Sequence, residues 1–136
     1  MSSTSRIIAN VPLLLIPYAI YHVLWLSGGT AGMKDPVLGD FFSRGDLVVF
    51  IGIVTLYVEI FKSTRTGGGA IMDHMASMVL FIVALVEFLL AGAIAGSSSF
   101  FLLMMIMLVD VVGGFTITIK GARRDFGAGG GGIPLG

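Results

Sequence analysis

Four apolar stretches dominate this sequence, and each is long enough to cross the hydrocarbon core of a bilayer as a helix. They cover residues 7–27, 47–63, 70–95 and 100–119. Only 12% of the residues are charged, whereas soluble domains carry about a quarter. We therefore expect an all-α membrane protein, with a four-transmembrane-helix bundle over residues 1–126 and a Gly-rich cytoplasmic tail at 127–136.

The segments between these stretches are rich in Gly, Pro and Ser, which is typical of loops. The connection at 96–99 is so short that the third and fourth spans should form a tight antiparallel hairpin. In the longer connection at 28–45, residues 37–42 are a candidate for a segment lying flat at the membrane surface. Pro17 falls inside the first span, where a proline is expected to kink the helix.

The Lys and Arg residues predict the orientation of the bundle. If both termini are cytoplasmic, the cytoplasmic side holds six basic residues and the other side holds two, Lys34 and Arg44. The six are Arg6, Lys62, Arg65, Lys120, Arg123 and Arg124. This distribution satisfies the positive-inside rule. We expect Lys120, Arg123 and Arg124 to contact anionic lipid headgroups at the cytoplasmic face.

Three acidic residues, Glu59, Glu87 and Asp110, fall within the second, third and fourth spans. Counting along each helix at about 1.5 Å per residue places all three near the middle of the membrane. Each shares its helix face with small residues, which mark close packing between membrane helices, so the acids should point into the bundle. No Lys or Arg is expected at that depth, and we therefore expect most of these carboxyl groups to be protonated hydrogen-bond donors.

Two functions fit this cluster of acids. The first is a non-enzymatic structural or accessory subunit, which self-assembles as a homo-oligomer or docks on a larger membrane complex through small-residue faces and buried carboxyls. The alternative is a small proton or cation channel or transporter that uses the three acids. Asp73 and His74 open the third span. They either stabilise the helix start and sit at the headgroups, or form a cytoplasmic gate.

Other function classes find no support in the residues. The chain has no cysteine, and its two histidines, His22 and His74, are expected near opposite membrane surfaces. No Ser-His-Asp or Cys-His arrangement can then be assembled, so we expect no catalytic residue. Methionines in apolar spans are far more often packing than ligands, so we expect neither a metal site nor a cofactor. The net charge of zero offers no attraction to nucleic acid.

Several short motifs in the second half of the chain are similar to a known group. They are Lys62-x-Thr64-Arg65-Thr66-Gly67, Asp73-His74, Val86-Glu87-Phe88-Leu89, Val109-Asp110-Val111 with Gly114-Phe115, and Ala122-Arg123-Arg124-Asp125. With these motifs, residues 59–125 resemble a group of small, uncharacterised four-span bacterial inner-membrane proteins. The resemblance implies a bacterial source, location in the inner (plasma) membrane and the four-span hairpin topology. It implies no activity.

Overall fold

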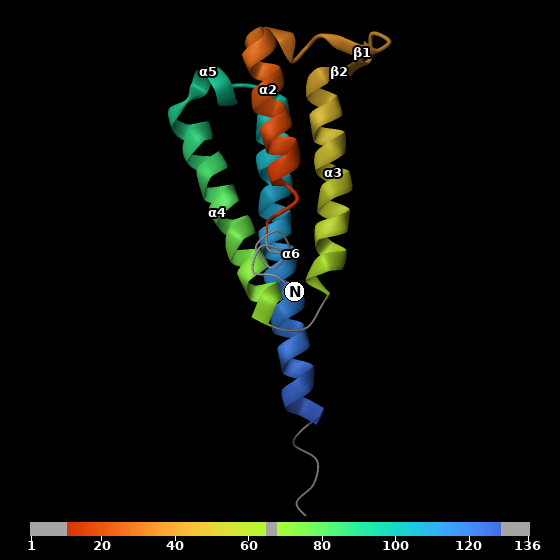
Figure 1. Cartoon of the computed structure of the whole chain (residues 1–136), viewed down its shortest axis with the longest axis vertical. Coiled ribbons are helices and arrows are strands. Elements are labelled where there is room, and N and C mark those ends of the chain that lie inside the picture. Colours follow the sequence, from red (N-terminus) through yellow and green to blue (C-terminus); the bar gives the residue numbers. More distant parts are fainter. Residues whose placement is uncertain (1–10, 65–67, 129–136) are drawn as a thin grey trace, which may run out of the picture.

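Four long helices make up most of the computed structural model, which describes residues 11–64 and 68–128 (Figure 1). They are α2 (Leu15–Gly32), α3 (Arg44–Ser63), α4 (Gly68–Leu90) and α6 (Ser98–Ala128). Successive long helices run in opposite directions (Figure 1). α6 packs along both α3 and α4, and α2 packs mainly on α3. The expected all-helical class is confirmed, apart from one short β-ribbon.

α2 begins later than the sequence predicts, and its proline does not kink it. The helix begins at Leu15, so Pro17 lies in the first turn. A backbone N–H in the first turn has no partner within the helix, and a proline there removes no hydrogen bond. The kink expected at Pro17 is therefore wrong. The irregular residue is Gly29, whose φ of 62° and ψ of −161° suit glycine.

Part of the connection between α2 and α3 is a two-stranded antiparallel ribbon of β1 (Pro36–Leu38) and β2 (Phe42–Ser43). The register pairs Pro36 with Ser43 and Leu38 with Phe42. Gly39 allows the turn between the strands because its φ is 60°, a region that other residues rarely adopt. The candidate surface segment at 37–42 thus forms most of this ribbon.

α3 begins with a reciprocal cap made by Ser43 and Asp46. The Ser43 hydroxyl accepts a hydrogen bond from the backbone N–H of Asp46 at 3.2 Å, and the Asp46 carboxylate accepts one from the backbone N–H of Ser43 at 2.9 Å. Such a capping box satisfies donors that the first helical turn leaves free. It sets the start of α3 at the end of the ribbon.

The connection between α4 and α6 is bent rather than a simple tight turn. Ala91 leaves the helical region with φ −113° and ψ 56°, and α5 (Gly92–Ala95) adds one short helix before α6. The Ser97 hydroxyl accepts a hydrogen bond from the backbone N–H of Phe100 at 3.1 Å and so caps α6. α4 and α6 are antiparallel neighbours, as expected (Figure 1), but α5 changes which residues face each other.

Small residues let α3 and α6 pack closely. A Cβ atom at Gly52 would lie 3.1 Å from Leu103 and 3.2 Å from Ile106, and one at Gly45 would overlap the Ser99 side chain. The small-residue face of α3 is therefore already covered by α6 of the same chain.

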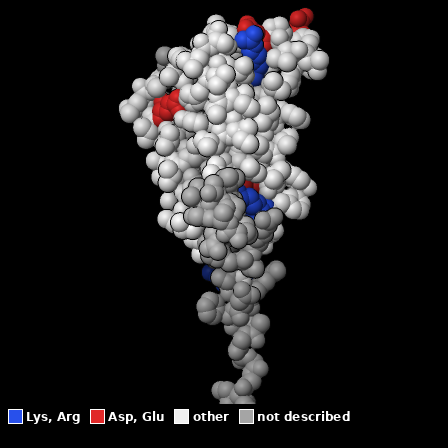
Figure 2. All heavy atoms as spheres, in the orientation of Figure 1, with Lys and Arg blue, Asp and Glu red and all other residues white. Residues whose placement is uncertain are grey.

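The outer surface of the bundle is strongly apolar. Two helical segments, Ile71–Leu90 and Ser98–Gly121, are long and apolar enough to cross a membrane, with mean hydropathies of 1.9 and 2.3. Large apolar side chains are also exposed on α2 and α3, including Leu26 and Phe50. On the face in Figure 2 most of the surface is white, which marks uncharged residues, and the charged atoms form a few separate patches, with several at the upper end. This surface suits contact with lipid.

Candidate functional site

Polar side chains inside the bundle form two separate clusters. The first, which we call the inner cluster, consists of Glu59 and Lys62 on α3, Asp73, His74 and Ser77 on α4, and Asp110 on α6. Five of these six residues are at most 5% exposed, the exception being Lys62. Buried titratable groups need partners because desolvation of a charge is costly.

Lys62 joins α3 to α4 within the inner cluster. Its ammonium nitrogen lies 3.2 Å from Glu59 Oε2 and 2.8 Å from Asp73 Oδ1. It also donates to the backbone carbonyl of Val11 at 3.3 Å. The expectation that no Lys or Arg reaches the buried acids is therefore wrong. The reason is the length of the side chain, which runs from the end of α3 back to the carboxyl groups.

Glu59 also holds the chain just before α2. The backbone N–H of Leu13 donates to Glu59 Oε1 at 2.8 Å, while Oε2 faces Lys62. Both oxygens of this carboxyl are thus engaged within the chain, and Glu59 is only 2% exposed. Thr55, which shares the face of Glu59, donates instead to carbonyls of its own helix at Ile51 and Gly52.

The other half of the inner cluster contains buried polar atoms that lack a hydrogen-bond partner. They are His74 Nε2, Ser77 Oγ and Asp110 Oδ2. The three side chains are neighbours, and the Ser77 hydroxyl lies near enough to the Asp110 carboxyl for a weak hydrogen bond. Native proteins leave few such atoms, and each calls for an explanation such as a water, an ion or a proton-exchanging role.

The His74 ring fits against a glycine of α6. A Cβ atom at Gly114 would overlap three atoms of the imidazole, so this position has room for the ring only because the side chain is a hydrogen. Gly113 differs, since a Cβ there would meet nothing within 4 Å. Asp73 and His74 are 5% and 2% exposed. They therefore lie inside the bundle rather than on its surface.

The second cluster, which we call the outer cluster, consists of Tyr18, His22 and Glu87. The Tyr18 hydroxyl donates to Glu87 Oε2 at 2.5 Å, and His22 Nε2 lies 2.6 Å from Glu87 Oε1. His22 Nδ1 lies 2.8 Å from the backbone carbonyl of Tyr18, one turn earlier in α2. This cluster connects α2 to α4. Its side chains are only partly buried, with 29% of His22 and 15% of Glu87 exposed.

Aromatic rings surround the outer cluster. Tyr18 and His22 have ring centroids 4.5 Å apart, and Phe100 at the start of α6 lies 6.3 Å from His22. The Tyr21 hydroxyl donates to the carbonyl of Ile94 at 2.7 Å and lies 2.7 Å from Ser97 Oγ. These contacts join α2 to α5 and to the start of α6.

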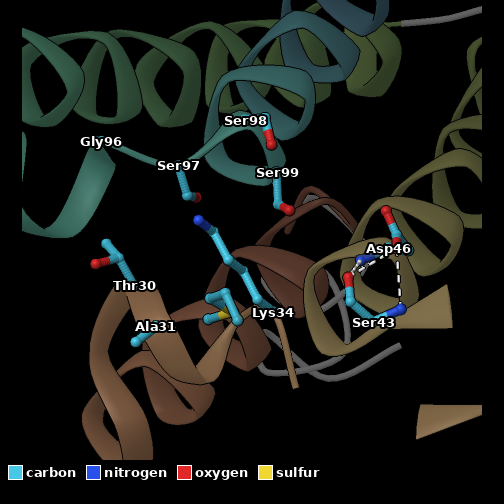
Figure 3. Close-up of a pocket in the computed structure, with 10 residues that line it drawn as sticks. Thr30, Ala31, Lys34, Ser43, Asp46, Gly96, Ser97, Ser98 and Ser99 are labelled. Carbon is cyan, nitrogen blue, oxygen red and sulfur yellow. Dashed lines mark hydrogen bonds between the residues drawn. The ribbon is translucent and has the colours of Figure 1, made fainter. Parts of the chain in front are cut away.

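A polar cavity of about 440 Å³ opens at this same end of the bundle. It is lined by the end of α2, the start of α3 and the segment 96–99 before and within the start of α6 (Figure 3). Lys34 extends toward Ser97, while Asp46 turns to its capping partner Ser43 (Figure 3). Because Ser97 also contacts Tyr21, the cavity adjoins the outer cluster.

Apolar side chains separate the two clusters. On α4 the buried residues Leu80 and Ala84 lie between Ser77 and Glu87, which are ten residues or about 15 Å apart. On α6 the buried Leu103 and Met107 lie between the outer cluster and Asp110 and belong to the same apolar core.

Comparison with known proteins finds no matching family model, no similar curated protein and no similar solved structure. The resemblance of residues 59–125 to small four-span bacterial proteins therefore stays a prediction.

The structure divides the three acids that the sequence places at one depth. Glu59 and Asp110 belong to the inner cluster and are linked through Lys62 and Asp73. Glu87 belongs to the outer cluster. Residue counting missed this separation because it assumed that α4 and α6 meet at a simple turn, whereas α5 intervenes. The Tyr18 hydrogen bond, the Lys62 contacts and the link between His22 and Glu87 were not predicted as site interactions.

Lys120 and Arg123 lie exposed near the end of α6, and the side chain of Arg124 falls outside the described residues. Among the residues that the structure describes, no three His, Asp or Glu side chains are arranged to hold a metal ion.

Proposed function

We propose that the chain is a multi-pass membrane protein, without enzymatic activity, whose bundle interior binds and passes protons. The apolar surface and the two long apolar helices support insertion in a membrane. All four long helices would then span the bilayer, with Lys62, Lys120 and Arg123 toward one end and Lys34 and Arg44 toward the other. The positive-inside rule favours cytoplasmic termini. A bacterial inner membrane follows only from the resemblance of residues 59–125.

The observation that carries this proposal is the buried group of His74, Ser77 and Asp110, in which His74 Nε2 has no hydrogen-bond partner among the described residues. Imidazole, hydroxyl and carboxyl groups all accept and donate protons, and they are brought together in the buried interior. Ionisable residues inside a membrane are costly and are typically kept for proton or ion handling. One or two water molecules bonded to these side chains would be enough to carry a proton between them.

The rest of the inner cluster gives this group a connection to the cytoplasmic end. Lys62 is partly exposed and contacts Asp73, which precedes His74 in α4. Charge can therefore enter beside Lys62 and reach Asp110 through neighbouring titratable groups. In this role Asp73 and His74 belong to the pathway itself and are not a separate gate.

Proton flux into vesicles tests this proposal. The protein is reconstituted in liposomes that contain a pH-sensitive dye, and a potassium diffusion potential supplies the driving force. We expect flux from the parent protein and its loss in Asp110→Asn, which keeps the shape of the side chain. Asp40→Asn, an exposed substitution in the ribbon turn, is the matched control. No flux above empty liposomes from the parent protein would overturn the proposal.

A second candidate is the structural or accessory subunit expected first from the sequence. The faces of Gly45, Gly52 and Gly114 are covered within the chain, which removes most of the surface that this hypothesis used. On α6, however, Gly113 and Gly121 have no neighbour within 4 Å. Small residues on an open helix face favour close contact with another membrane helix. A homo-oligomer or a larger complex could form there.

One pair of measurements separates the two candidates. Light scattering in detergent gives the size of the particle, and the liposome assay gives flux, each for the parent protein and Gly113→Leu. If Gly113→Leu forms a smaller particle than the parent protein, and the parent shows no flux, the result favours the subunit. Retained flux and unchanged size in Gly113→Leu favour proton handling by the single bundle.

A further inference from the structure

The contacts of His22 fix the position of one of its hydrogen atoms. Nδ1 lies 2.8 Å from the backbone carbonyl oxygen of Tyr18. A carbonyl oxygen only accepts hydrogen bonds, so Nδ1 must carry the hydrogen. In a neutral imidazole the other nitrogen, Nε2, then has a lone pair and no hydrogen.

Nε2 faces a carboxyl oxygen at a distance that requires a proton between them. His22 Nε2 and Glu87 Oε1 lie 2.6 Å apart. A neutral imidazole and a carboxylate would bring two lone pairs together, which is repulsive. The contact is attractive either as imidazolium with carboxylate or as neutral imidazole with carboxylic acid. Both forms hold one proton more than neutral imidazole plus carboxylate.

The neighbouring groups do not supply this proton. The Tyr18 hydroxyl donates to the other carboxyl oxygen, Oε2, at 2.5 Å, so its hydrogen points away from His22. The remaining polar groups near the pair are the Tyr21 hydroxyl on α2, the Ile94 carbonyl on α5 and the Ser97 hydroxyl before α6. Tyr18, Tyr21 and Glu87 are the titratable groups that face His22. In the described part of the chain no Lys or Arg pairs with Glu87.

We propose that His22 and Glu87 form a proton-binding site that holds one exchangeable proton at neutral pH and ties α2 to α4 while the proton is bound. The loaded pair has no net charge, which suits a membrane interior. When the proton leaves to water, a neutral imidazole with hydrogen on Nδ1 and a carboxylate with one negative charge remain. The contact between Nε2 and Oε1 then becomes repulsive, and the connection of α2 to α4 is weakened to the Tyr18 hydrogen bond.

The pair is not fully enclosed by the bundle. Both side chains are partly exposed. The polar cavity at the end of the bundle includes Ser97, whose hydroxyl contacts Tyr21, and the Tyr21 ring centroid lies 5.7 Å from that of His22. The site goes beyond the proposed function, because proton binding here holds whether or not protons cross the apolar layer to the inner cluster.

The charge states of His22 and Glu87 are measured directly by solid-state NMR. The full chain is labelled with 15N-His and 13C-Glu and placed in vesicles of phosphatidylcholine and phosphatidylglycerol. Assignment is simple because the chain has two histidines, and Glu59 and Glu87 are its two glutamates. At neutral pH we expect either an imidazolium at His22 or a carboxylic acid at Glu87. Neutral imidazole together with carboxylate in the parent protein would overturn the proposal without any variant.

Two variants test that the proton is shared. In Glu87→Gln we expect a neutral His22 with hydrogen on Nδ1, and in His22→Gln we expect a carboxylate at Glu87. One of these two states differs from the parent protein, and which one differs depends on which of the two forms the parent holds. Independent groups would be unaffected by either change, and that result would also overturn the proposal. Ser27→Ala, an exposed change on the same helix whose hydroxyl donates only to the carbonyl of Leu24, is the control and should keep the proton. Glu87→Gln preserves the contacts, since its amide donates to Nε2 and accepts from Tyr18.

A second readout does not depend on labelling. Thermal unfolding of the parent protein should occur at lower temperature as the pH becomes alkaline, because loss of the proton makes one contact between α2 and α4 repulsive. Glu87→Gln should lose this alkaline dependence. An equal alkaline dependence in both proteins would show that the pair does not link proton binding to the attachment of α2. Neither measurement depends on proton flux through the inner cluster. A failure of the proposed function can therefore be distinguished from a failure of the His22 and Glu87 site.

Discussion

Lys62 on α3 lies 2.8 Å from Asp73 on α4, and this contact joins two helices that otherwise pack little on each other. The same ammonium group faces Glu59 at 3.2 Å, so one basic side chain serves two buried carboxyls. The pairing offsets part of the acidic charge of the inner cluster and connects α3 to α4.

Lys62→Met should be strongly destabilising. The variant leaves Glu59 and Asp73 without their cation, and breaking a buried ion pair by removal of one partner costs about 3–5 kcal/mol. Unfolding of the detergent-solubilised protein, followed by circular dichroism, measures the loss. Lys120→Met removes an exposed Lys near the end of α6 and should stay within about 0.5 kcal/mol of the parent. Equal effects of the two substitutions would contradict the assigned role of Lys62.

The adjacent glycines Gly113 and Gly114 should respond oppositely to alanine. At Gly114 the added methyl group overlaps the His74 ring, and such overpacking costs about 1–3 kcal/mol. At Gly113 the methyl group meets nothing, so alanine should stabilise the helix by about 0.4–1 kcal/mol. Unfolding of the two single variants provides a matched comparison. The double variant Gly114→Ala with His74→Ala should recover part of the loss, and no recovery would show that the ring is not the obstacle.

The cap of α3 should make stability depend on acidic pH. Hydrogen bonds from Ser43 hold the pKa of Asp46 below its ordinary value. A lowered pKa in the folded state contributes stability above the unfolded pKa of about 3.9, and this contribution is lost as the pH falls through the folded pKa. Ser43→Ala should cost about 1 kcal/mol near neutral pH and much less at strongly acidic pH. Unfolding at both pH values measures the difference, and a loss that does not change with pH would contradict the cap.

Tyr21→Phe should loosen the connection between α4 and α6, which the Tyr21 side chain holds against α2. The hydroxyl donates to the Ile94 carbonyl and contacts Ser97, and a hydrogen bond of this kind contributes about 0.5–1.5 kcal/mol. Hydrogen exchange of α5 and the first turn of α6 should increase, while exchange in the middle of α3 should not. Tyr57→Phe, an exposed change on α3, is the control. Unchanged exchange at α5 would show that this contact does not hold the connection.

The positions of the helices follow from the apolar stretches, because an apolar run of about 20 residues bounded by Gly and Ser leaves little other choice. The direction in which Glu59 and Asp110 point also follows, since small residues share their faces. The ends of the helices and the connections between them are less clearly predicted by the sequence. Pro17 lies in a first turn rather than in a helix interior because α2 begins at Leu15, and nothing in the local composition distinguishes these two placements.

The partners of the acids depend on distances that residue counting does not supply. A lysine side chain reaches back along its helix, so Lys62 pairs with carboxyl groups that residue counting places deeper in the membrane. The four residues of α5 change the register of α4 against α6, so Asp110 faces Ser77 and His74 while Glu87 faces α2. His22 pairs with Glu87 across 65 residues of sequence, a separation over which no spacing rule applies.

The layer of Leu80, Ala84, Leu103 and Met107 places apolar side chains between the two clusters. A proton that moves from one end of the bundle to the other must cross this layer, whereas exchange between each cluster and the nearer end does not require it. The layer would therefore limit the rate of any flux, and each cluster would hold the proton before or after the crossing.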